Sequence, residues 1–282
     1  MSEPTSPERA ERETAGPAGA EPETAARGFA GRAAPAGADR AARALADVVG
    51  ESRPRLPDDG RDPEVPVAAT VVVLRDGDAG PEVLMLERPD RGSFAGAWVF
   101  PGGKVDPGDR ATDGESEEDV ARRAATRETW EEAGLEIDPE ALWTVSVWDP
   151  PPGLALRIRT WFFAVRAGEG EVVLSPDEAV AAEWVDPAAL LARHGRGEVT
   201  LYPPTWVTLR TLAGQPDVEA VLATLRLAGF RSFETVARRS EGGPVLLWQE
   251  DGEYDLDAGD AASVARHRLE IGALPWIYTR TD

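Results

Sequence analysis

The stretch 127–135, RETWEEAGL, places three glutamates within five positions, at Glu128, Glu131 and Glu132. In an α-helix, which turns about 100° per residue, their side chains project within one arc about 100° wide. If a helix spans 117–133, that arc also holds Ala121 and Ala124, with Val120 at its edge. Like charges at this spacing repel one another, and a divalent cation bound through oxygen, Mg²⁺ or Mn²⁺, would compensate them. The pattern indicates a metal site; a helix exposed on several sides is the alternative.

A glycine pair lies upstream of these glutamates, in FPGGKVDPGD (residues 100–109). Gly102 and Gly103 follow a short apolar run that is typical of a strand. Glycine permits unusual backbone angles and close approach of another group, so a backbone carbonyl of this turn could complete the coordination of a cation. A plain tight turn is the alternative.

Together the two segments resemble the signature of the Nudix hydrolases, a glycine, an acid and then R-E-U-x-E-E-x-G-U, where U is bulky and apolar. Gly103 takes the glycine position and Asp109 that of the first acid. The second half is matched by Arg127, Glu128, Glu131, Glu132, Gly134 and Leu135. Two departures are Thr129 at the first apolar position and an insertion of ten residues before Arg127. Asp119 has the regular spacing to Arg127 and is the alternative for the first acid.

The resemblance implies water-driven cleavage of a diphosphate linked to another moiety, with Mg²⁺ or Mn²⁺ as cofactor. Glu128, Glu131 and Glu132 would bind the metal together with the carbonyl of Gly102. Arg127 would orient Glu128 through a charge-assisted hydrogen bond.

Family members often use a further acid from a distant loop as metal ligand or general base. The segment SPDEAVAAEWVD (175–186) offers Glu178 and Glu183, with Asp177 as a neighbour. Glu183 adjoins an expected strand, where a structural role is favoured. Glu178 lies in the preceding loop, which suits a mobile catalytic acid, and we expect it to act here.

Substrate-binding residues are expected on two segments. Arg88 ends an expected strand, and Arg91, Phe94 and Trp98 follow near the glycine turn. Strand alternation would place Arg157, Arg159 and Trp161 on one face, where arginines could bind a phosphate beside an aromatic ring. A solvated strand face is the alternative. The predicted substrate-binding residues are Arg88, Trp98, Arg157 and Arg159.

The long insertion and the C-terminal extension resemble the Nudix branch that includes peroxisomal coenzyme A diphosphatases, which implies CoA or acyl-CoA as candidate substrates. The short motif of CoA-specific members is not cleanly present. A non-catalytic Nudix-like module that binds a nucleotide and regulates is the alternative, but all three metal glutamates are intact. An isomerase would need a cysteine-type proton-transfer site, and the chain has no cysteine.

The elements that must position these residues predict an α/β/α sandwich around a mixed sheet, the fold that the Nudix resemblance also implies. A hairpin is expected from 65–77 and 81–88. The further expected elements are a strand at 97–100, a helix at 117–133, strands at 142–148, 154–167 and 181–186, and a helix at 187–194. Ser116 suits the N-cap of the helix at 117–133 and Gly134 its C-terminal end.

The chain divides by composition into a disordered segment at 1–63, a Nudix domain at 64–200 and a C-terminal α/β extension at 201–282 packed on that domain. Residues 1–63 are nearly empty of large apolar side chains, so they cannot offset the entropy of ordering. The extension is expected to contain a helix at 216–229, a hairpin at 244–256 and a helix at 261–270.

The composition narrows the class of partner. A net charge of −21 disfavours nonspecific binding to nucleic acid or to an anionic membrane. The absence of cysteine suits a reducing compartment, and no apolar run reaches the ~20 residues that span a bilayer. We expect a cytoplasmic protein that binds a small-molecule diphosphate; homodimer formation is left open.

Overall fold

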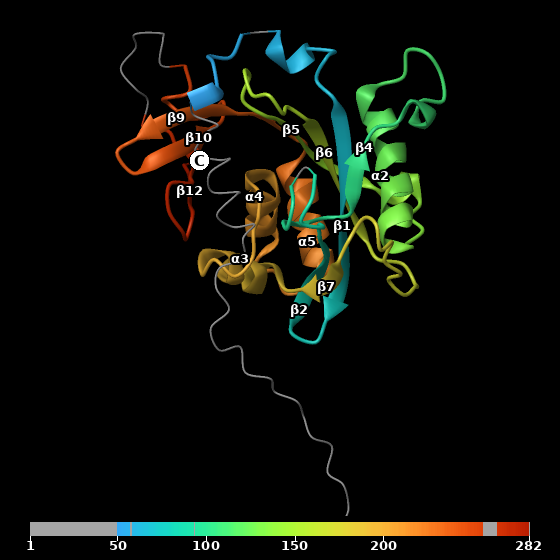
Figure 1. Ribbon diagram of the computed structural model, residues 1–282. Helices are drawn as coiled ribbons and strands as arrows, with labels where there is room; N and C mark the ends of the chain where they lie inside the picture. Colours follow the sequence, from blue (N-terminus) through green and yellow to red (C-terminus); the bar gives the residue numbers. More distant parts are fainter. Residues whose placement is uncertain (1–49, 57, 93, 256–263, 282) are drawn as a thin grey trace, which may run out of the picture. The chain divides into compact units, whose positions relative to one another are not determined.

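The computed structural model of the protein describes residues 50–56, 58–92, 94–255 and 264–281. An eight-stranded mixed sheet dominates this part of the chain, with the strand order β3-β2-β1-β6-β5-β8, β4 beside β1 and β7 beside β2 (Figure 1). Its strands are β1 (Val67–Gly77), β2 (Gly80–Glu87), β3 (Trp98–Val99), β4 (Gly102–Lys104), β5 (Trp143–Asp149), β6 (Arg159–Arg166), β7 (Ala181–Val185) and β8 (Arg231–Glu234).

β1 lies at the centre of this sheet because its side chains are apolar on both faces. It pairs in parallel with β6 over eight residue pairs, from Val67↔Arg159 to Leu74↔Arg166, and antiparallel with β2 in the predicted hairpin. Seven consecutive residues of β1 are buried, as expected for a strand that is covered on both sides.

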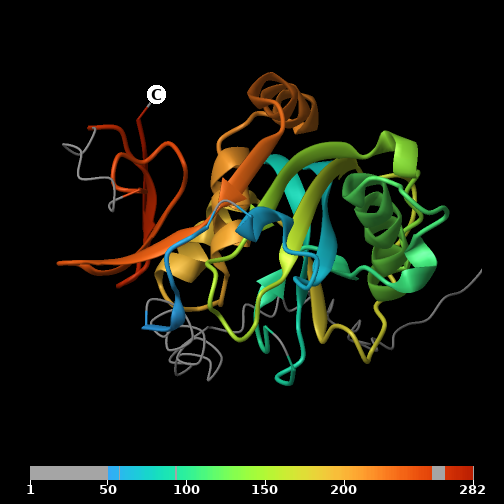
Figure 2. The same cartoon turned by 90° about the horizontal axis from the view of Figure 1, so that it is seen from above.

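Helices cover both faces of the sheet. α2 (Glu117–Ala133) packs its alanines against Val71 and Val73 of β1. Leu190 of α3 (Pro187–Gly195), Leu209 of α4 (Pro203–Leu212) and Leu222 of α5 (Val218–Ala228) belong instead to the core with Val72 and Leu74. Figure 2 shows α2 on one side of the sheet and α4 on the other. The predicted α/β/α sandwich around a mixed sheet is confirmed.

A second, four-stranded antiparallel sheet follows, in the order β12-β11-β10-β9. Its strands are β9 (Val236–Ser240), β10 (Gly243–Leu247), β11 (His267–Glu270) and β12 (Ile277–Arg280). β8, just before it, pairs in parallel with β5 of the large sheet. The chain after α4 therefore contributes to both sheets.

Two sequence-based expectations for this region need correction, and one helix was missed. The expected helix at 261–270 is wrong where it is described, because His267–Glu270 is strand β11. The expected hairpin at 244–256 is also wrong, because β10 pairs with β9 and β11 instead. Helix α4 was not predicted, since its sequence PPTWVTLRTL opens with two prolines and is rich in β-branched residues; proline is nevertheless well accommodated in a first helical turn.

The segment 1–63, expected to be disordered, lies outside the described residues up to residue 49 and at residue 57. The described remainder makes specific contacts. Arg53 binds Asp59 through two hydrogen bonds of 2.8 and 2.6 Å, and Arg55 binds Asp149 at the end of β5.

Candidate active site

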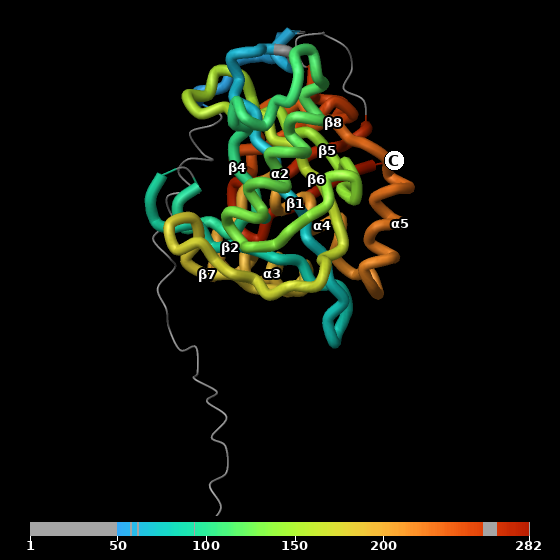
Figure 3. Tube along the Cα trace, turned by 90° about the vertical axis from the view of Figure 1, so that its right-hand side faces the viewer, coloured from blue at the N-terminus to red at the C-terminus, as the bar shows by residue number. Residues whose placement is uncertain are grey.

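Helix α2 begins and ends where its capping residues predict. The Ser116 hydroxyl accepts a hydrogen bond from the Asp119 N–H, and Gly134 closes the helix in the left-handed region at φ 67°. Viewed onto this helix, α2 lies in front of β1 and β6 (Figure 3). The helix thereby carries its glutamates to β4, the strand that contains the glycine pair.

Both glycines of β4 are required by close contacts. A Cβ on Gly102, whose φ is 151°, would lie 2.2 Å from the carbonyl oxygen of Ala69 in β1. A Cβ on Gly103 would lie 2.3 Å from the carboxylate carbon of Glu128. The glycine pair thus lets β4 touch a strand on one side and the carboxylate of Glu128 on the other.

Glu132 is buried between this strand and β2, with 1% of its side chain exposed. It accepts hydrogen bonds from the Gly102 N–H at 2.8 Å and from Nη1 of Arg88 at 2.9 Å. Burial raises the pKa of Glu132 to about 7, and the charges of Glu128 and Glu178 act in the same direction. The two hydrogen bonds only partly offset the cost of burying this charge.

Glu128 and Glu131 share one counter-charge. Arg127 donates from Nη1 to Glu128 at 2.9 Å and to Glu131 at 3.0 Å. Glu128 is mostly buried, whereas Glu131 is half exposed. Burial raises the pKa of Glu128 despite Arg127, and the charges of Glu131 and Glu178 raise it further. The cluster therefore holds more negative charge than the surrounding protein compensates.

The contacts of Arg127 distinguish Asp109 from Asp119, the two alternatives for the first acid of the motif. Its Nε and Nη2 each donate at 2.9 Å to the carboxylate of Asp109, and Nη2 donates to the Lys104 carbonyl at 3.1 Å. Burial opposes ionisation of Asp109, but the hydrogen bonds from Arg127 and the Asp106 N–H hold its pKa below the usual value. Asp119 instead bonds to Ser116 at the start of α2. The inserted residues between Asp109 and α2 leave this contact intact.

The structure separates the candidates for the distal acid. Glu178 is exposed in a turn, and its charge raises the pKa of both Glu128 and Glu132, so it lies within electrostatic reach of the cluster. Glu183, on β7, is bound by Nη1 of Arg193 through both carboxylate oxygens, at 2.9 and 2.7 Å. The catalytic role of Glu178 stays a prediction, and its charge acts on the two buried glutamates of α2.

The neighbouring Asp177 bears on a contact that the sequence did not predict. Its carbonyl accepts a hydrogen bond of 3.2 Å from Nη2 of Arg91, and its own side chain is 93% exposed. Arg91 thereby joins the loop after β2 to the turn that holds Glu178. The sequence signal was only an arginine three positions after Arg88.

The donor chemistry fits a hard divalent cation, because every candidate side chain supplies carboxylate oxygen. Within the described residues, no group of three His, Asp or Glu side chains is arranged to hold a metal ion. Glu132 is bound to Gly102 and Arg88, and Glu131 to Arg127. Gly102 meets Glu132 through its N–H, so its predicted role as a carbonyl ligand stays a prediction.

Of the predicted substrate-binding residues, Arg88 lies at the cluster and Trp98 does not face it. Trp98 is 8% exposed and belongs to the core between the sheet and α3 and α4. The guanidinium of Arg193 lies over its ring at 5.4 Å. The expectation that Trp98 contacts substrate is corrected: its side chain on β3 faces into the core.

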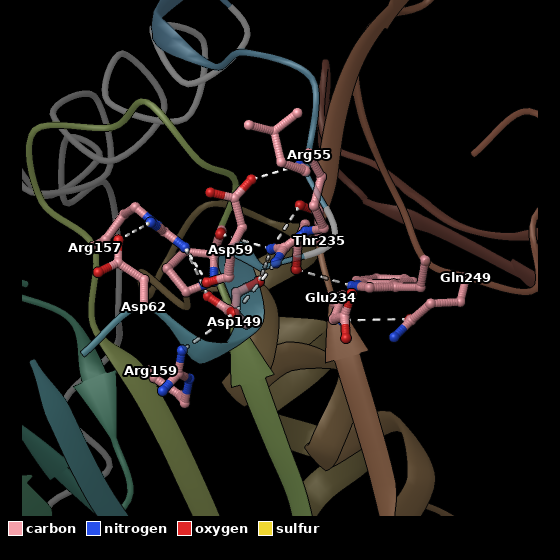
Figure 4. Close-up of polar contacts among 12 residues, drawn as sticks. Arg55, Asp59, Asp62, Asp149, Arg157, Arg159, Glu234, Thr235 and Gln249 are labelled. Atoms are coloured by element: carbon pink, nitrogen blue, oxygen red, sulfur yellow. Dashed lines mark hydrogen bonds and ion pairs between the residues drawn. The ribbon is translucent and has the colours of Figure 1, made fainter. Parts of the chain in front are cut away.

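Arg157 and Arg159 are also placed elsewhere. Arg157 donates to Asp149 at 3.1 Å, and Arg159 lies beside the same carboxylate (Figure 4). Arg159 also donates to Glu117 at 3.0 Å. Glu117 is the first residue of α2, about 22 Å along the helix from Glu132. The expectation that this pair binds substrate at the acidic cluster is corrected: both guanidiniums are nearly buried in ion pairs at the opposite end of α2.

Comparison with known proteins accords with this geometry. Residues 65–203 match the family model described as the NUDIX domain. This part of the chain is a Nudix domain. It contains every residue of the acidic cluster, both glycines of β4 and the turn with Glu178. None of the curated proteins compared with the chain matches it.

Among solved structures, the chain resembles the NUDIX hydrolase from Alicyclobacillus acidocaldarius, at 26% identity and a TM-score of 0.50, over 57% of this chain and 96% of that one. It also resembles the MutT NUDIX hydrolase from Burkholderia pseudomallei, at 24% identity and a TM-score of 0.38, over 52% and 97%. The domain match and the first of these neighbours support a Nudix-type pyrophosphohydrolase. Within the described residues, no helix is both long and apolar enough to span a bilayer.

Proposed function

We propose that the protein hydrolyses, with Mg²⁺ or Mn²⁺, a diphosphate linkage in a nucleoside diphosphate joined to another moiety. CoA and acyl-CoA are the first substrates to test. The observation that carries the proposal is the contact of Glu128 and Glu132 from α2 with the glycines of β4. Glu131 shares Arg127 with Glu128, and the charge of Glu178 acts on both Glu128 and Glu132.

The charge balance of the site supports a bound cation. Five carboxylates, those of Asp109, Glu128, Glu131, Glu132 and Glu178, are accompanied by three guanidiniums, those of Arg88, Arg123 and Arg127. A diphosphate substrate would add further negative charge. Binding it against this cluster would be favoured by further positive charge, which a divalent cation supplies.

Glu128, Glu131 and Glu132, with the carbonyl of Gly102, would hold the cation. When bound, Mg²⁺ or Mn²⁺ neutralises phosphate oxygens and lowers the pKa of a coordinated water. Arg127, itself held by Asp109, orients Glu128 and favours its ionised form against the effect of burial. Glu178, which is exposed in its turn, would accept the proton of the attacking water.

Arg88 completes the site on the side of β2. In the structure Arg88 donates a hydrogen bond to Glu132. With substrate bound, its guanidinium would donate to a phosphate oxygen instead. We propose further that the chain comprises a segment at 1–63, a Nudix domain at 64–200 and an extension at 201–282. We also propose that the protein is cytoplasmic and binds a small-molecule diphosphate. Size-exclusion chromatography with light scattering would decide whether the protein is a homodimer.

The test is product release from CoA, acyl-CoA, NADH, ADP-ribose and nucleoside triphosphates, each with Mg²⁺, with Mn²⁺ and with EDTA. We expect metal-dependent cleavage that Glu128→Gln reduces at least a hundredfold. Glu169→Gln, which removes an exposed acid outside the site, should leave the rate unchanged. Preference for CoA would assign the CoA branch. Absence of cleavage of every substrate would contradict the proposal and favour a regulatory binding module.

A further inference from the structure

The turn that carries Glu178 is attached to the end of helix α2 by its backbone. The Val173 N–H donates to the Ala133 carbonyl at 2.9 Å. The Ser175 N–H donates to the Glu132 carbonyl at 3.1 Å. The last carbonyls of an α-helix have no partner within the helix, so these two N–H groups satisfy acceptors that the end of α2 leaves free.

The carbonyl of Ser175 closes the turn. It accepts hydrogen bonds from the N–H groups of Glu178 and Ala179, each at 3.1 Å. Ser175 therefore contacts Glu132 through its N–H and Glu178 through its carbonyl. One residue links the backbone of the buried glutamate of α2 to the backbone of the distal acid.

The far end of the turn is attached to β2. The Val180 N–H donates at 2.9 Å to the carbonyl of Glu87, the last residue of β2. Between the two attachments, Ala179 is 3% exposed and belongs to the same core cluster as the alanines of α2. The sequence suggested a mobile loop at this position. In the structure the turn is instead held at both ends and by one buried side chain.

We propose that Ser175 is a positioning residue that fixes the carboxylate of Glu178 relative to Glu132. This inference rests on the proposed function, in which Glu178 accepts the proton of the attacking water. A general base works only within hydrogen-bond reach of the proton that it removes, and a misplacement of about 1 Å can lower the rate about a hundredfold. Attachment to the backbone of Glu132 gives the turn a reference point on the same helix that carries the other acids.

The first measurement separates the backbone of Ser175 from its side chain. Ser175→Pro removes the N–H that binds Glu132 and keeps the carbonyl that closes the turn. With the substrate, among CoA, acyl-CoA, NADH, ADP-ribose and nucleoside triphosphates, that the wild type cleaves fastest, we expect kcat to fall about a hundredfold and KM to stay unchanged. The conservative variant Ser175→Ala keeps both backbone groups and should retain the wild-type kcat.

The decisive control repeats the change in a protein that lacks the distal acid. If the loss arises from displacement of Glu178, Ser175→Pro should lower kcat no further in the Glu178→Gln background. A general loss of structure would lower kcat by the same factor with and without Glu178. The dissociation constant of Mn²⁺, measured by electron paramagnetic resonance without substrate, should stay unchanged because the carboxylates of α2 are retained.

A second variant tests the other attachment and covers the case in which Ser175→Pro fails to unfold cooperatively. Val180→Pro removes the N–H that binds the Glu87 carbonyl. The side chain of Val180 is 58% exposed, so this change leaves the core intact. We expect the same loss of kcat, again with no further loss in the Glu178→Gln background.

Hydrogen exchange gives a readout that requires neither metal nor turnover. In EDTA, the amides of Ser175, Glu178 and Val180 should exchange at least about tenfold more slowly than in an unstructured chain, since each donates a backbone hydrogen bond. In Ser175→Pro, the protection of the Glu178 amide should fall.

Three results would overturn the inference. These are a wild-type kcat in Ser175→Pro, an equal loss of kcat with and without Glu178, and unprotected amides at Ser175 and Val180 in the wild type. The proposed function fails separately: a wild-type protein with protected amides that cleaves no diphosphate would lose the hydrolase proposal and retain the attachment of the turn to α2.

Discussion

A carboxylate that is 1% exposed, as Glu132 is, carries a large desolvation penalty when it is ionised. The Gly102 N–H and Arg88 offset part of that penalty, and the charges of Glu128 and Glu178 add to it. At the residue scale, the ionised form of Glu132 therefore lowers the stability of the folded protein. The folded protein without metal should be more stable when Glu132 is protonated.

The sign of this effect follows from the pKa. The ordinary value for Glu132 is 4.5 and the folded value is about 7, so the folded state binds the proton more tightly. The stabilisation from protonation is complete below pH 4.5 and is lost as the pH rises through about 7. His194 acts oppositely, because burial lowers its pKa from 6.5 to about 4 and its contribution is lost as the pH falls.

Comparison of Glu132→Gln with wild type cancels the contribution of His194. In EDTA, we expect the stability of the variant relative to wild type to rise by roughly 3 kcal/mol between pH 4.5 and pH 7. Urea unfolding at a series of pH values measures this difference. The exposed Glu169→Gln should show no such trend. A flat difference for Glu132→Gln would mean that Glu132 is not destabilised by burial.

At the scale of elements, the site depends on the approach of α2 to β4. The two elements can meet because Gly103 has no side chain where the carboxylate of Glu128 lies. A strand with any larger residue there would hold the helix away or turn Glu128 aside. The glycine of the motif is thus needed for the contact between β4 and α2, and the glutamates of the motif are placed by that contact.

Gly103→Ala tests this contact. The added Cβ would lie 2.3 Å from the carboxylate carbon of Glu128, so that side chain must move. A displacement of about 1 Å at a catalytic group lowers rates by about a hundredfold, which is the loss of kcat/KM that we expect. Gly168→Ala is the control, since an added Cβ there meets nothing within 4 Å. Equal activity of the two variants would show that activity does not depend on the contact between Gly103 and Glu128.

At the scale of the whole molecule, Asp149 joins segments that are far apart in the chain. Arg55, from the segment before β1, donates to the Asp149 carboxylate at 3.2 Å and to the Thr235 carbonyl, beyond β8, at 3.3 Å. Arg157 and Arg159 reach Asp149 from the start of β6, as Figure 4 shows. These ion pairs connect the N-terminal segment, the large sheet and the chain leading to the second sheet.

Removal of one partner should destabilise this network strongly. Arg55 is 6% exposed, and Arg55→Met leaves Asp149 buried with less compensation, so we expect a loss of about 3 kcal/mol in unfolding free energy. Arg196→Met, at an exposed pair with Glu198, should lose less than about 1 kcal/mol. Urea denaturation compares them, and similar losses would show that the network contributes no more than a surface pair.

The local sequence was sufficient to predict the position and the ends of α2. Ser116 and Gly134 are capping residues whose effect depends on the neighbouring backbone, and the helix occupies 117–133 as predicted. Local reasoning failed at α4, whose β-branched residues are buried by tertiary contacts, and at 267–270, where pairing with distant strands made a strand of an expected helix. Periodicity describes a preference, and long-range packing can override it.

The sequence by itself determined the family motif, the acids near Arg127 and the helix that carries them, because these depend on spacing within a few turns. The tertiary structure decided that Asp109 meets Arg127 while Asp119 caps the helix. It also decided that Trp98 is buried and Phe94 exposed. Both outcomes depend on which strands and loops meet across the fold, and the free energy of those contacts comes from residues far away in the chain.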